Sequence, residues 1–408
     1  MPVSSGAPAD RSELLDLGAR TVELMLTTGC NLRCRYCYQR RRAPRTMSPA
    51  VLDAAVRRLV ASRYDRPWLI FYGGEPLLAA PLVRRALERV RLWAPRRMRP
   101  DVRILTNGTR LDEKMTRFLV SRDVFVTLSF DGVAPAQDDR APESFALLDR
   151  LLVRLRRDHP RHFRERFGVK VTLTSRNAPF LSPSFRYLLS RGVRDVEVCA
   201  VIPDDGGWNA RTRRELDRQL AEVVRLSVVE FRRSGRVPFR VFQGPVAAPA
   251  ADGAAACGCA SRGSLFVDVD GSLAPCERLA PSTLRSPPVA LRRVAAALGG
   301  LHVTDPDLPA ALARRERIAR RLPFLAGARD RQGPRGPCAT CKARSVCFVG
   351  PVAVTSNGGR VPQFHCDVNR LLARHRAAFL SQTAPEPGTP LVRRRPPETA
   401  SPTEEDLR

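Results

Sequence analysis

Short apolar segments alternate with amphipathic segments between residues 21 and 202, and this alternation restricts the possible folds more than any other feature of the chain. In the amphipathic segments the apolar residues lie three or four positions apart, which is typical of helices that cover one face of a sheet. The predicted strands are residues 22–26, 68–72, 102–106, 124–129, 169–174 and 196–202, and the predicted helices are residues 48–62, 81–93, 112–121, 143–157 and 182–190. Six strands predict an α/β fold with a partial (β/α)6 TIM-like barrel, in which ligands lie beyond the carboxyl ends of the strands.

The composition excludes several classes of protein. With 408 residues, of which 43% are hydrophobic, the chain is long enough to bury a large core. No apolar stretch approaches the roughly 20 residues of a membrane span, and the first residues lack the basic and apolar regions of a signal peptide. We therefore expect a cytoplasmic protein with no membrane partner. In a reducing compartment, eleven cysteines are expected to bind metals and not to form disulfides.

The net charge of +28 comes almost entirely from arginine, because lysine occurs only at positions 114, 170 and 342. The arginines are scattered over every predicted helix and do not form one stripe. We interpret most of them as a solvated surface. The alternative is a surface that binds an acidic peptide or nucleic acid, and the scatter argues against nucleic acid.

Three cysteines lie within eight residues, directly after the first predicted strand: Cys30, Cys34 and Cys37. A [4Fe–4S] cluster has four irons, so three cysteine ligands leave one iron free to bind a small molecule. A structural zinc site normally has four ligands, and no His or Cys occurs in the hundred residues after Cys37. The spacing therefore favours a cluster with one reactive iron.

Polar and glycine-rich segments follow the second, third and fourth predicted strands. Each segment taken singly predicts only a turn. Paired glycines expose the backbone to close approach, and the carboxylate of Glu75 is available to a cation. Because the carboxyl ends of parallel strands meet at one edge of the sheet, we expect these segments and the cysteines to share one pocket. The segments are Gly73-Gly74-Glu75-Pro76, Thr106-Asn107-Gly108-Thr109 and Ser129-Phe130-Asp131-Gly132.

Residues 21–202 resemble the core of radical S-adenosylmethionine (radical SAM) enzymes. The hallmark of that family is Cys-x-x-x-Cys-x-aromatic-Cys, which Cys30, Cys34, Tyr36 and Cys37 match. The resemblance implies that the three cysteines hold a [4Fe–4S] cluster whose free iron binds the amino and carboxylate groups of S-adenosylmethionine. The cofactor contacts that it implies are Gly73, Gly74 and Glu75 for the methionyl amino group, Thr106, Asn107 and Ser129 for the ribose and carboxylate, and Tyr36 for the adenine.

Most of the remaining cysteines lie in the C-terminal part, which resembles the SPASM extension of peptide- and protein-modifying radical SAM enzymes. The resemblance implies a small cysteine-rich domain that binds auxiliary [4Fe–4S] clusters. One set of ligands lacks a member, because Pro351 stands where the family has a cysteine. We favour an open iron in that cluster, and the alternatives are a smaller or labile cluster and no cluster. The complete set is Cys338, Cys341, Cys347 and Cys366, and the incomplete set is Cys257, Cys259 and Cys276.

Two interpretations compete for some of these cysteines. A zinc ribbon built on Cys338 and Cys341 is the alternative to a cluster, because Cys-x-x-Cys is equally a zinc signature. Cys199 belongs to neither set and lies in an apolar run, so we expect it to be a small buried hydrophobe.

Two further residues are candidates through their neighbours. Glu277 follows Cys276 directly, and we interpret it as a hydrated surface carboxylate. The alternative, implied by the resemblance to sulfatase-maturing enzymes that carry an acid there, is a catalytic residue that takes the substrate proton. His365, beside Cys366, is interpreted as a bystander, and its alternative role is the missing cluster ligand.

The chain is predicted to divide into five parts. The last part is rich in Pro, Glu, Thr and Arg without periodicity, which predicts disorder. The parts are an N-terminal extension (residues 1–20), the radical SAM core (21–205), a helical bridge and linker (206–250), the SPASM domain (251–381) and a disordered tail (382–408).

Together these features predict an enzyme. It would reductively cleave S-adenosylmethionine to a 5′-deoxyadenosyl radical and modify a ribosomally made peptide or protein by hydrogen abstraction, giving a crosslink, an epimer or an oxidised residue. The alternatives are maturation of a small redox cofactor or tetrapyrrole, and a non-enzymatic metal protein that binds nucleic acid. A flavodoxin- or ferredoxin-like electron donor is also implied by the resemblance.

The substrate is expected to carry an acidic leader. Only about 20 residues precede the first predicted strand, too few for the winged-helix leader-binding domain of some maturases. We therefore expect the leader to bind the basic surface of the core or a separate recognition protein.

Overall fold

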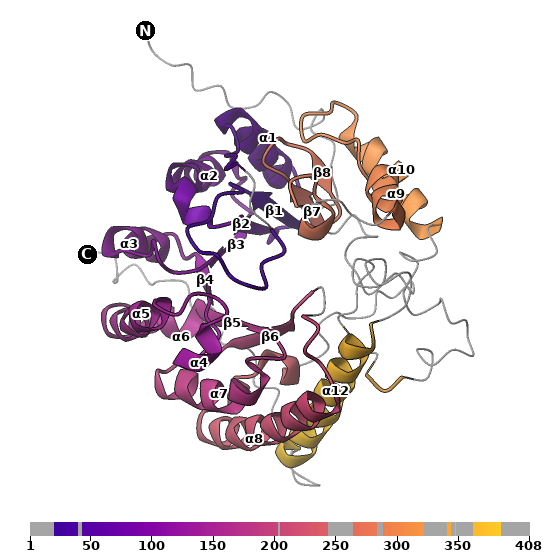
Figure 1. Cartoon of the computed structure of the whole chain (residues 1–408). Coiled ribbons are helices and arrows are strands. Elements are labelled where there is room, and N and C mark those ends of the chain that lie inside the picture. Colours follow the sequence, from indigo (N-terminus) through magenta and orange to yellow (C-terminus); the bar gives the residue numbers. More distant parts are fainter. Residues whose placement is uncertain are drawn as a thin grey trace.

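One sheet forms the centre of the computed structural model, which describes residues 20–39, 43–202, 205–243, 264–283, 289–321, 341–343, 347 and 362–384. The strand order is β6-β5-β4-β3-β2-β1-β7-β8 (Figure 1). The first six strands pair in parallel and in sequence order, so the predicted partial barrel is confirmed. They are β1 (Thr21–Met25), β2 (Trp68–Tyr72), β3 (Asp101–Thr106), β4 (Phe125–Ser129), β5 (Phe167–Leu173) and β6 (Val196–Ala200).

Each of the five predicted helices overlaps an observed one. The hydroxyl of Ser48 accepts a hydrogen bond from the N–H of Val51 and Pro49 is the first helical residue, which begins the first helix. Asp112 caps the third in the same way. The helices are α1 (Pro49–Val60), α2 (Ala80–Trp93), α3 (Glu113–Ser121), α4 (Ala134–Gln137), α5 (Ser144–Asp158), α6 (Pro160–Glu165) and α7 (Leu181–Ser190), with 3₁₀ turns η1 (Pro76–Ala79) and η2 (Ala178–Phe180).

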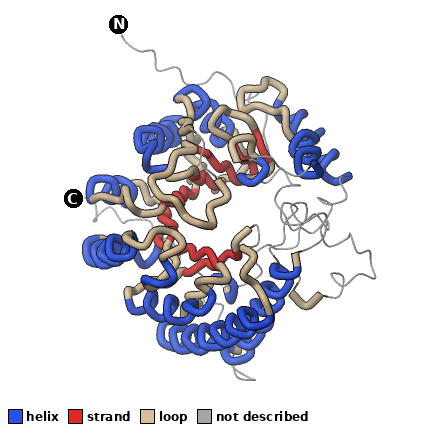
Figure 2. Tube along the Cα trace, viewed as in Figure 1, coloured by secondary structure: helices blue, strands red, loops and turns tan. Residues whose placement is uncertain are grey.

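The outer face of the sheet packs against these helices and forms the main core. Leu24, Phe71, Ile104 and Leu128, one from each of β1 to β4, are completely buried. Figure 2 shows the helices as a layer around the strands, and their apolar faces belong to the same core. Truncating a leucine in such a core to alanine costs about 2–5 kcal/mol.

The inner face of the sheet carries charged side chains instead. Glu23 of β1, Arg103 of β3, Lys170 of β5 and Glu197 of β6 alternate along their strands with buried apolar residues. Lys170 and Glu197 form an ion pair at 3.1 Å across neighbouring strands. The inner face is therefore polar, and paired charges offset part of the cost of removing them from water.

One segment from the second half of the chain extends the sheet beyond β1. β7 (Ser264–Val267) pairs in parallel with β1 and in antiparallel with β8 (Leu273–Ala274). The short turn η5 (Glu277–Leu279) follows the hairpin. The region predicted as a separate cysteine-rich unit therefore contributes strands to the barrel sheet itself.

Another segment from the second half packs near β6. α12 (Gln363–Thr383) lies beside α8 (Ala210–Ser234) in Figure 1. Trp208 stacks on Phe364 with ring centroids 4.3 Å apart. Phe242 stacks on Phe379 at 5.0 Å. Among the residues that the structure describes, no helix has both the length and the apolar character needed to cross a membrane. The remaining elements are α8 (Ala210–Ser234), η3 (Arg240–Phe242), α9 (Val289–Leu298), α10 (Leu308–Arg321) and α12 (Gln363–Thr383).

Candidate active site

A cavity of about 910 Å³ lies at the carboxyl ends of the strands. Its walls come from the segments after β1 to β4, from β5 and β6, and from η5 and α12. Its size is in the upper part of the range for pockets that bind cofactors and small ligands, about 300–1,000 Å³. The residues predicted from sequence that line it are Cys30, Cys34, Tyr36, Cys37, Gly73, Gly74, Thr106, Asn107, Ser129 and Glu277.

The three cysteines share the loop after β1, and their thiols are close enough to influence one another electrostatically. The N–H of Cys37 donates to the carbonyl of Cys34 at 3.1 Å. The N–H of Leu32 and the side-chain amide of Asn107 donate to the Sγ of Cys30, at 3.4 and 3.8 Å. Hydrogen bonds to a thiolate orient it and tune a metal cluster that it binds.

The chemistry of these thiols fits a bound cluster. Burial raises the pKa of Cys34 to about 11, and burial also raises the pKa of Cys30. The thiolate is the form that binds metal, and burial alone opposes it. Bound irons supply the positive charge that the thiolates need. Three thiols on one cavity wall therefore fit a [4Fe–4S] cluster that keeps one iron for another ligand.

The two glycines after β2 are required by close packing against the cysteine loop. The N–H groups of Gly74 and Glu75 donate to the carbonyls of Thr27 and Gly29, each at 2.8 Å. A Cβ atom at position 74 would lie 2.2 Å from the carbonyl oxygen of Gly29, and one at position 73 would lie 2.7 Å from that of Thr27. Because these distances are shorter than real Cβ contacts, only glycine fits there.

The carboxylate of Glu75 does not line the cavity, which corrects the expectation that it faces a ligand or a cation. It is completely buried and accepts hydrogen bonds from Thr106 Oγ1 and the N–H of Asn107, both at 2.7 Å, and from the N–H of Leu77 at 3.0 Å. Burial raises its pKa. The reason for the difference is that buried donors need an acceptor, and this carboxylate is the one available to them. Glu75 therefore ties β2 to β3 beneath the cavity.

The segment after β3 forms a small polar network beside the cysteine loop. The side-chain amide of Asn107 donates to Asn31 Oδ1 at 3.0 Å, and that of Asn31 donates to Thr109 Oγ1 at 2.7 Å. Thr109 in turn donates to Asn107 Oδ1 at 2.7 Å. Asn107 and Ser129 line the same cavity as the cysteines, so the predicted contacts of these two residues with S-adenosylmethionine are spatially compatible.

Tyr36 is anchored by two residues to which the sequence analysis assigned no role. Its hydroxyl donates to Asp131, and Arg140 donates to the same carboxylate at 3.1 and 3.2 Å. The N–H of Thr172 donates to it at 2.8 Å. Asp131 belongs to the Ser-Phe-Asp-Gly segment, so a signal for it existed, whereas Arg140 follows α4 without any motif.

Glu277 lies in another wall of the cavity, next to Arg278. The two side chains approach to 3.9 Å, and the Glu277 side chain is 29% exposed. Arg278 donates to the carbonyl of Ile202 at 2.8 Å, and its guanidinium lies 3.9 Å from the ring centroid of Tyr38. Glu277 is therefore a half-buried carboxylate inside the cavity, and its catalytic role stays a prediction.

Cys199 also lines the cavity, which differs from its expected role as a buried hydrophobe. Its thiol donates to Glu197 Oε1 at 3.3 Å, and Lys170 binds the same oxygen at 3.1 Å. Burial raises the pKa of Cys199 to about 11. The reason for the difference is the register of β6, which places Cys199 on the polar inner face with Glu197.

Only part of the C-terminal cysteine set is described. Arg370 of α12 lies near both Cys341 and Cys366, and His365 Nε2 is 3.1 Å from the carbonyl of Val201. The ligand roles proposed for these cysteines stay predictions. Cys276, Cys341, Cys347 and Cys366 are half-buried, and Cys257, Cys259, Cys338 and Pro351 lie outside the described residues.

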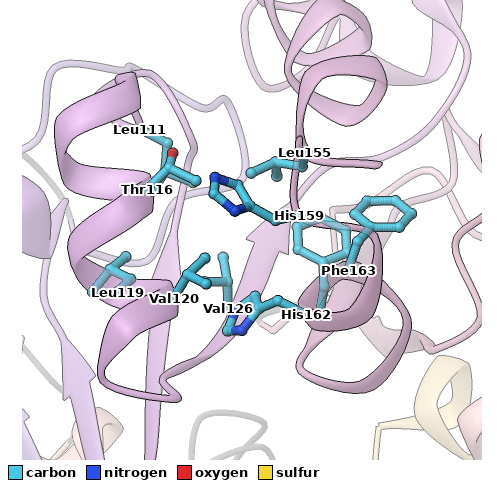
Figure 3. Close-up of a pocket in the computed structure, with 10 residues that line it drawn as sticks. Leu111, Thr116, Leu119, Val120, Val126, Leu155, His159, His162 and Phe163 are labelled. Carbon is cyan, nitrogen blue, oxygen red and sulfur yellow. The ribbon is translucent and has the colours of Figure 1, made fainter. Parts of the chain in front are cut away.

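A second cavity lies between α3 and the α5–α6 region and is too small for a ligand (Figure 3). Its volume is about 10 Å³, enough for at most one water molecule. Apolar side chains such as Leu119 and Phe163 line it together with His159 and His162. Burial lowers the pKa of His162 to about 4, so its ring is neutral at physiological pH. We therefore place the active site in the larger cavity.

Comparison with known proteins finds a family model and relatives that match parts of this chain. Residues 24–167 match the family model of the Radical SAM superfamily. The chain is 23% identical over 268 residues to the cysteine-type anaerobic sulfatase-maturating enzyme of Clostridium perfringens, which covers 62% of this chain and 72% of that protein. It is 33% identical over 139 residues to the GTP 3′,8-cyclase of Mycobacterium marinum, which covers 32% of this chain and 37% of that protein.

A solved structure, native anSMEcpe with bound AdoMet and Cp18Cys peptide, has the same fold. Its TM-score is 0.53 at 22% identity, over 63% of this chain and 73% of that chain. The radical SAM superfamily uses a [4Fe–4S] cluster and S-adenosylmethionine, and these are the cofactors of this chain. Residues 24–167 therefore form a radical SAM domain, and the chain is an enzyme.

Proposed function

We propose that this enzyme is a maturase, which modifies a ribosomally made peptide or protein by hydrogen abstraction. The observation that carries the proposal is the cavity of about 910 Å³, in which the cysteine loop and the carboxylate of Glu277 face the same space. The relative from Clostridium perfringens supports it, because the name of that enzyme states that it matures a sulfatase, which is a protein substrate.

In this proposal Cys30, Cys34 and Cys37 hold the cluster and leave one iron for S-adenosylmethionine. When bound, the two cofactors together supply an organic radical that removes a hydrogen atom from a substrate carbon. The protein positions that carbon, and a well-oriented pair of reactants gains several orders of magnitude in rate. The residues proposed to contact S-adenosylmethionine are Tyr36, Gly73, Gly74, Thr106, Asn107 and Ser129.

We assign Glu277 the role of general base. Oxidation of a carbon radical next to sulfur, oxygen or nitrogen releases a proton, and a carboxylate inside the cavity is placed to accept it. Two positive side chains lie near this carboxylate: Arg278 at 3.9 Å, and Lys170, which interacts with Glu277 electrostatically.

Apolar side chains complete the cavity and limit the access of water. Radical chemistry needs this protection, because water and oxygen divert reactive intermediates to side products. The apolar residues that line the cavity are Leu32, Leu105, Val198, Val201, Ile202, Val368 and Leu372.

We further propose auxiliary clusters in the C-terminal part and an electron donor of the flavodoxin or ferredoxin class. Cys276 directly precedes Glu277, so a cluster there would lie next to the proposed base and could accept the electron of the substrate radical. Iron analysis separates the alternatives, because three cubane clusters contain about 12 irons and two contain about eight.

The test is an anaerobic assay of the reconstituted enzyme with S-adenosylmethionine, dithionite and peptides encoded by short reading frames beside its gene. We expect 5′-deoxyadenosine together with a peptide that has lost two hydrogens, or has exchanged one for deuterium in heavy water if the product is an epimer. Peptides with and without an acidic leader, compared at rising salt, test the basic surface as the leader site. Cleavage of S-adenosylmethionine that no peptide stimulates would contradict the proposal.

A second candidate function is modification of a small-molecule precursor of a redox cofactor. The similarity to GTP 3′,8-cyclase favours it, because that name states a nucleotide substrate. The similarity covers 32% of this chain and 37% of that protein. GTP in the same assay decides between the two: formation of a nucleotide product with no change in any peptide would establish the second candidate.

A further inference from the structure

A buried ion pair lies beside the cysteine loop, and the proposed function uses it only to anchor Tyr36. Arg140 binds the carboxylate of Asp131 with two hydrogen bonds, at 3.1 and 3.2 Å. The two side chains are 8% and 0% exposed. A pair of charges is costly to bury, so its presence beside a predicted cluster ligand calls for an explanation beyond stability.

The pair is oriented with its positive end toward the cysteines. Arg140 lines the cavity together with Cys34 and Tyr36, whereas Asp131 is not among the described residues that line it. The guanidinium carbon of Arg140 lies 5.4 Å from the ring centroid of Tyr36. Asp131 turns toward β5, where it accepts the N–H of Thr172 at 2.8 Å. At Cys34 the electrostatic field of the pair is therefore positive, because Arg140 faces the thiol and Asp131 only partly neutralises it.

We propose that Arg140, positioned by Asp131, raises the reduction potential of the cluster at Cys34. Three thiolates give the cluster a net negative charge, and one more electron adds to it, so a nearby buried cation favours the reduced form. Asp131 limits this effect because its charge opposes that of Arg140. The inference rests on the proposed assignment of the cluster to Cys30, Cys34 and Cys37.

A structural role for the same pair makes a different prediction. Asp131 also accepts the hydroxyl of Tyr36, so loss of either charged residue could loosen the cysteine loop. A looser loop would shift the reduction potential of the cluster in the same direction, whichever of the two residues is replaced. An electrostatic role requires opposite directions, because Arg140→Gln removes a positive charge and Asp131→Asn removes a negative one.

The experiment is a redox titration of the reconstituted full-length enzyme without S-adenosylmethionine, followed by electron paramagnetic resonance. The signal that changes when S-adenosylmethionine is added identifies the cluster. At the potential where the wild-type cluster is half reduced, we expect the ratio of reduced to oxidised cluster to fall about tenfold in Arg140→Gln and to rise in Asp131→Asn. Arg140→Lys should keep the ratio within about threefold, because it keeps the positive charge even though it loses the two-bond contact with Asp131.

The control is Arg176→Gln, which removes an arginine that is 61% exposed and pairs with Asp139 at 3.0 Å. It should leave the ratio unchanged, since solvent screens an exposed charge.

Shifts in the same direction in both test variants, or weaker binding of S-adenosylmethionine with unchanged ratios, would overturn the inference. If Arg140→Gln assembles no cluster, Asp131→Asn decides alone, and an unchanged or lower ratio overturns the inference. A wild-type enzyme without any signal that responds to S-adenosylmethionine would overturn the proposed function, and this inference with it.

Discussion

The wall of the cavity that carries the cysteines and the wall that carries Glu277 are built in different ways. In the first, hydrogen bonds from backbone groups and the buried carboxylate of Glu75 join the ends of β1, β2 and β3. In the second, half-exposed side chains such as Lys170 and Glu277 come from segments far apart in the chain. We infer that the first wall is rigid and suited to one cofactor, whereas the second can change with the substrate.

The largest expected effect concerns the rigid wall. Replacing Cys30, Cys34 and Cys37 together by alanine should reduce the formation of 5′-deoxyadenosine to background and remove about four irons per chain. Chromatography of the products and iron analysis measure both. Cys199→Ala is the matched control, because it removes a cavity thiol outside the proposed ligand sets and should leave the iron count unchanged. Retention of full turnover in the triple variant would refute the assignment.

The next effect tests whether that wall is rigid. In Gly74→Ala the new Cβ would lie 2.2 Å from the carbonyl oxygen of Gly29, and two backbone segments must separate. We expect a loss of about 3 kcal/mol in the free energy of unfolding, measured with urea under anaerobic conditions. Gly29→Ala is the control, because its Cβ would come no closer than 3.3 Å to side-chain atoms and should cost less than half as much. Equal losses would show that the two strand ends move freely.

A third prediction separates the two walls by function. Glu277→Gln keeps the shape of the side chain and removes the proposed base, so modification of the peptide should slow about 100-fold. Formation of 5′-deoxyadenosine should stay within about threefold of the wild-type rate, because the substitution leaves the wall that carries the cysteines unchanged. Both rates come from one time course. If both rates fall together, Glu277 acts on the cofactor, and the two walls of the cavity do not have separate functions.

The smallest expected effect concerns the electrostatic interaction of Glu277 with Glu23, which lies on the inner face of the sheet. Burial and the charge of Glu277 raise the pKa of Glu23 from 4.5 to about 7. Because the folded state binds this proton more tightly than the unfolded state, the stability it contributes is complete below pH 4.5 and is lost as pH rises through 7. Relative to Glu23→Gln, the wild type should lose on the order of 2 kcal/mol between these limits.

Unfolding by urea at several pH values measures that loss. Glu277→Gln should make it smaller, because one of the two causes of the raised pKa is removed. A pH dependence that is identical in all three proteins would show that Glu23 and Glu277 are independent.

The sequence alone allowed prediction of the helices and strands, and of the cysteine and glycine segments that share one wall of the cavity. Both depend on local sequence patterns. The apolar periods located six strands, and Ser48 followed by Pro49 located a helix start. The glycines after β2 were recognisable because close backbone packing admits no other residue.

Features that depend on long-range register were not predictable in this way. Nothing local shows that Glu75 turns away from the cavity, since its three donors come from two separate segments. Cys199 was expected in the core because its neighbours are apolar, but the inner face of β6 is polar. The pairing of β7 with β1 joins residues more than 200 positions apart, which no periodicity reveals.

The most direct test of the central claim is Mössbauer spectroscopy of enzyme reconstituted with ⁵⁷Fe, before and after addition of S-adenosylmethionine. The account predicts that one iron per chain changes its spectrum on addition, because three thiolates leave a single iron open to the cofactor. The variant without Cys30, Cys34 and Cys37 should show no such change. A wild-type spectrum in which no iron responds, or an equal response in the variant, would contradict the account.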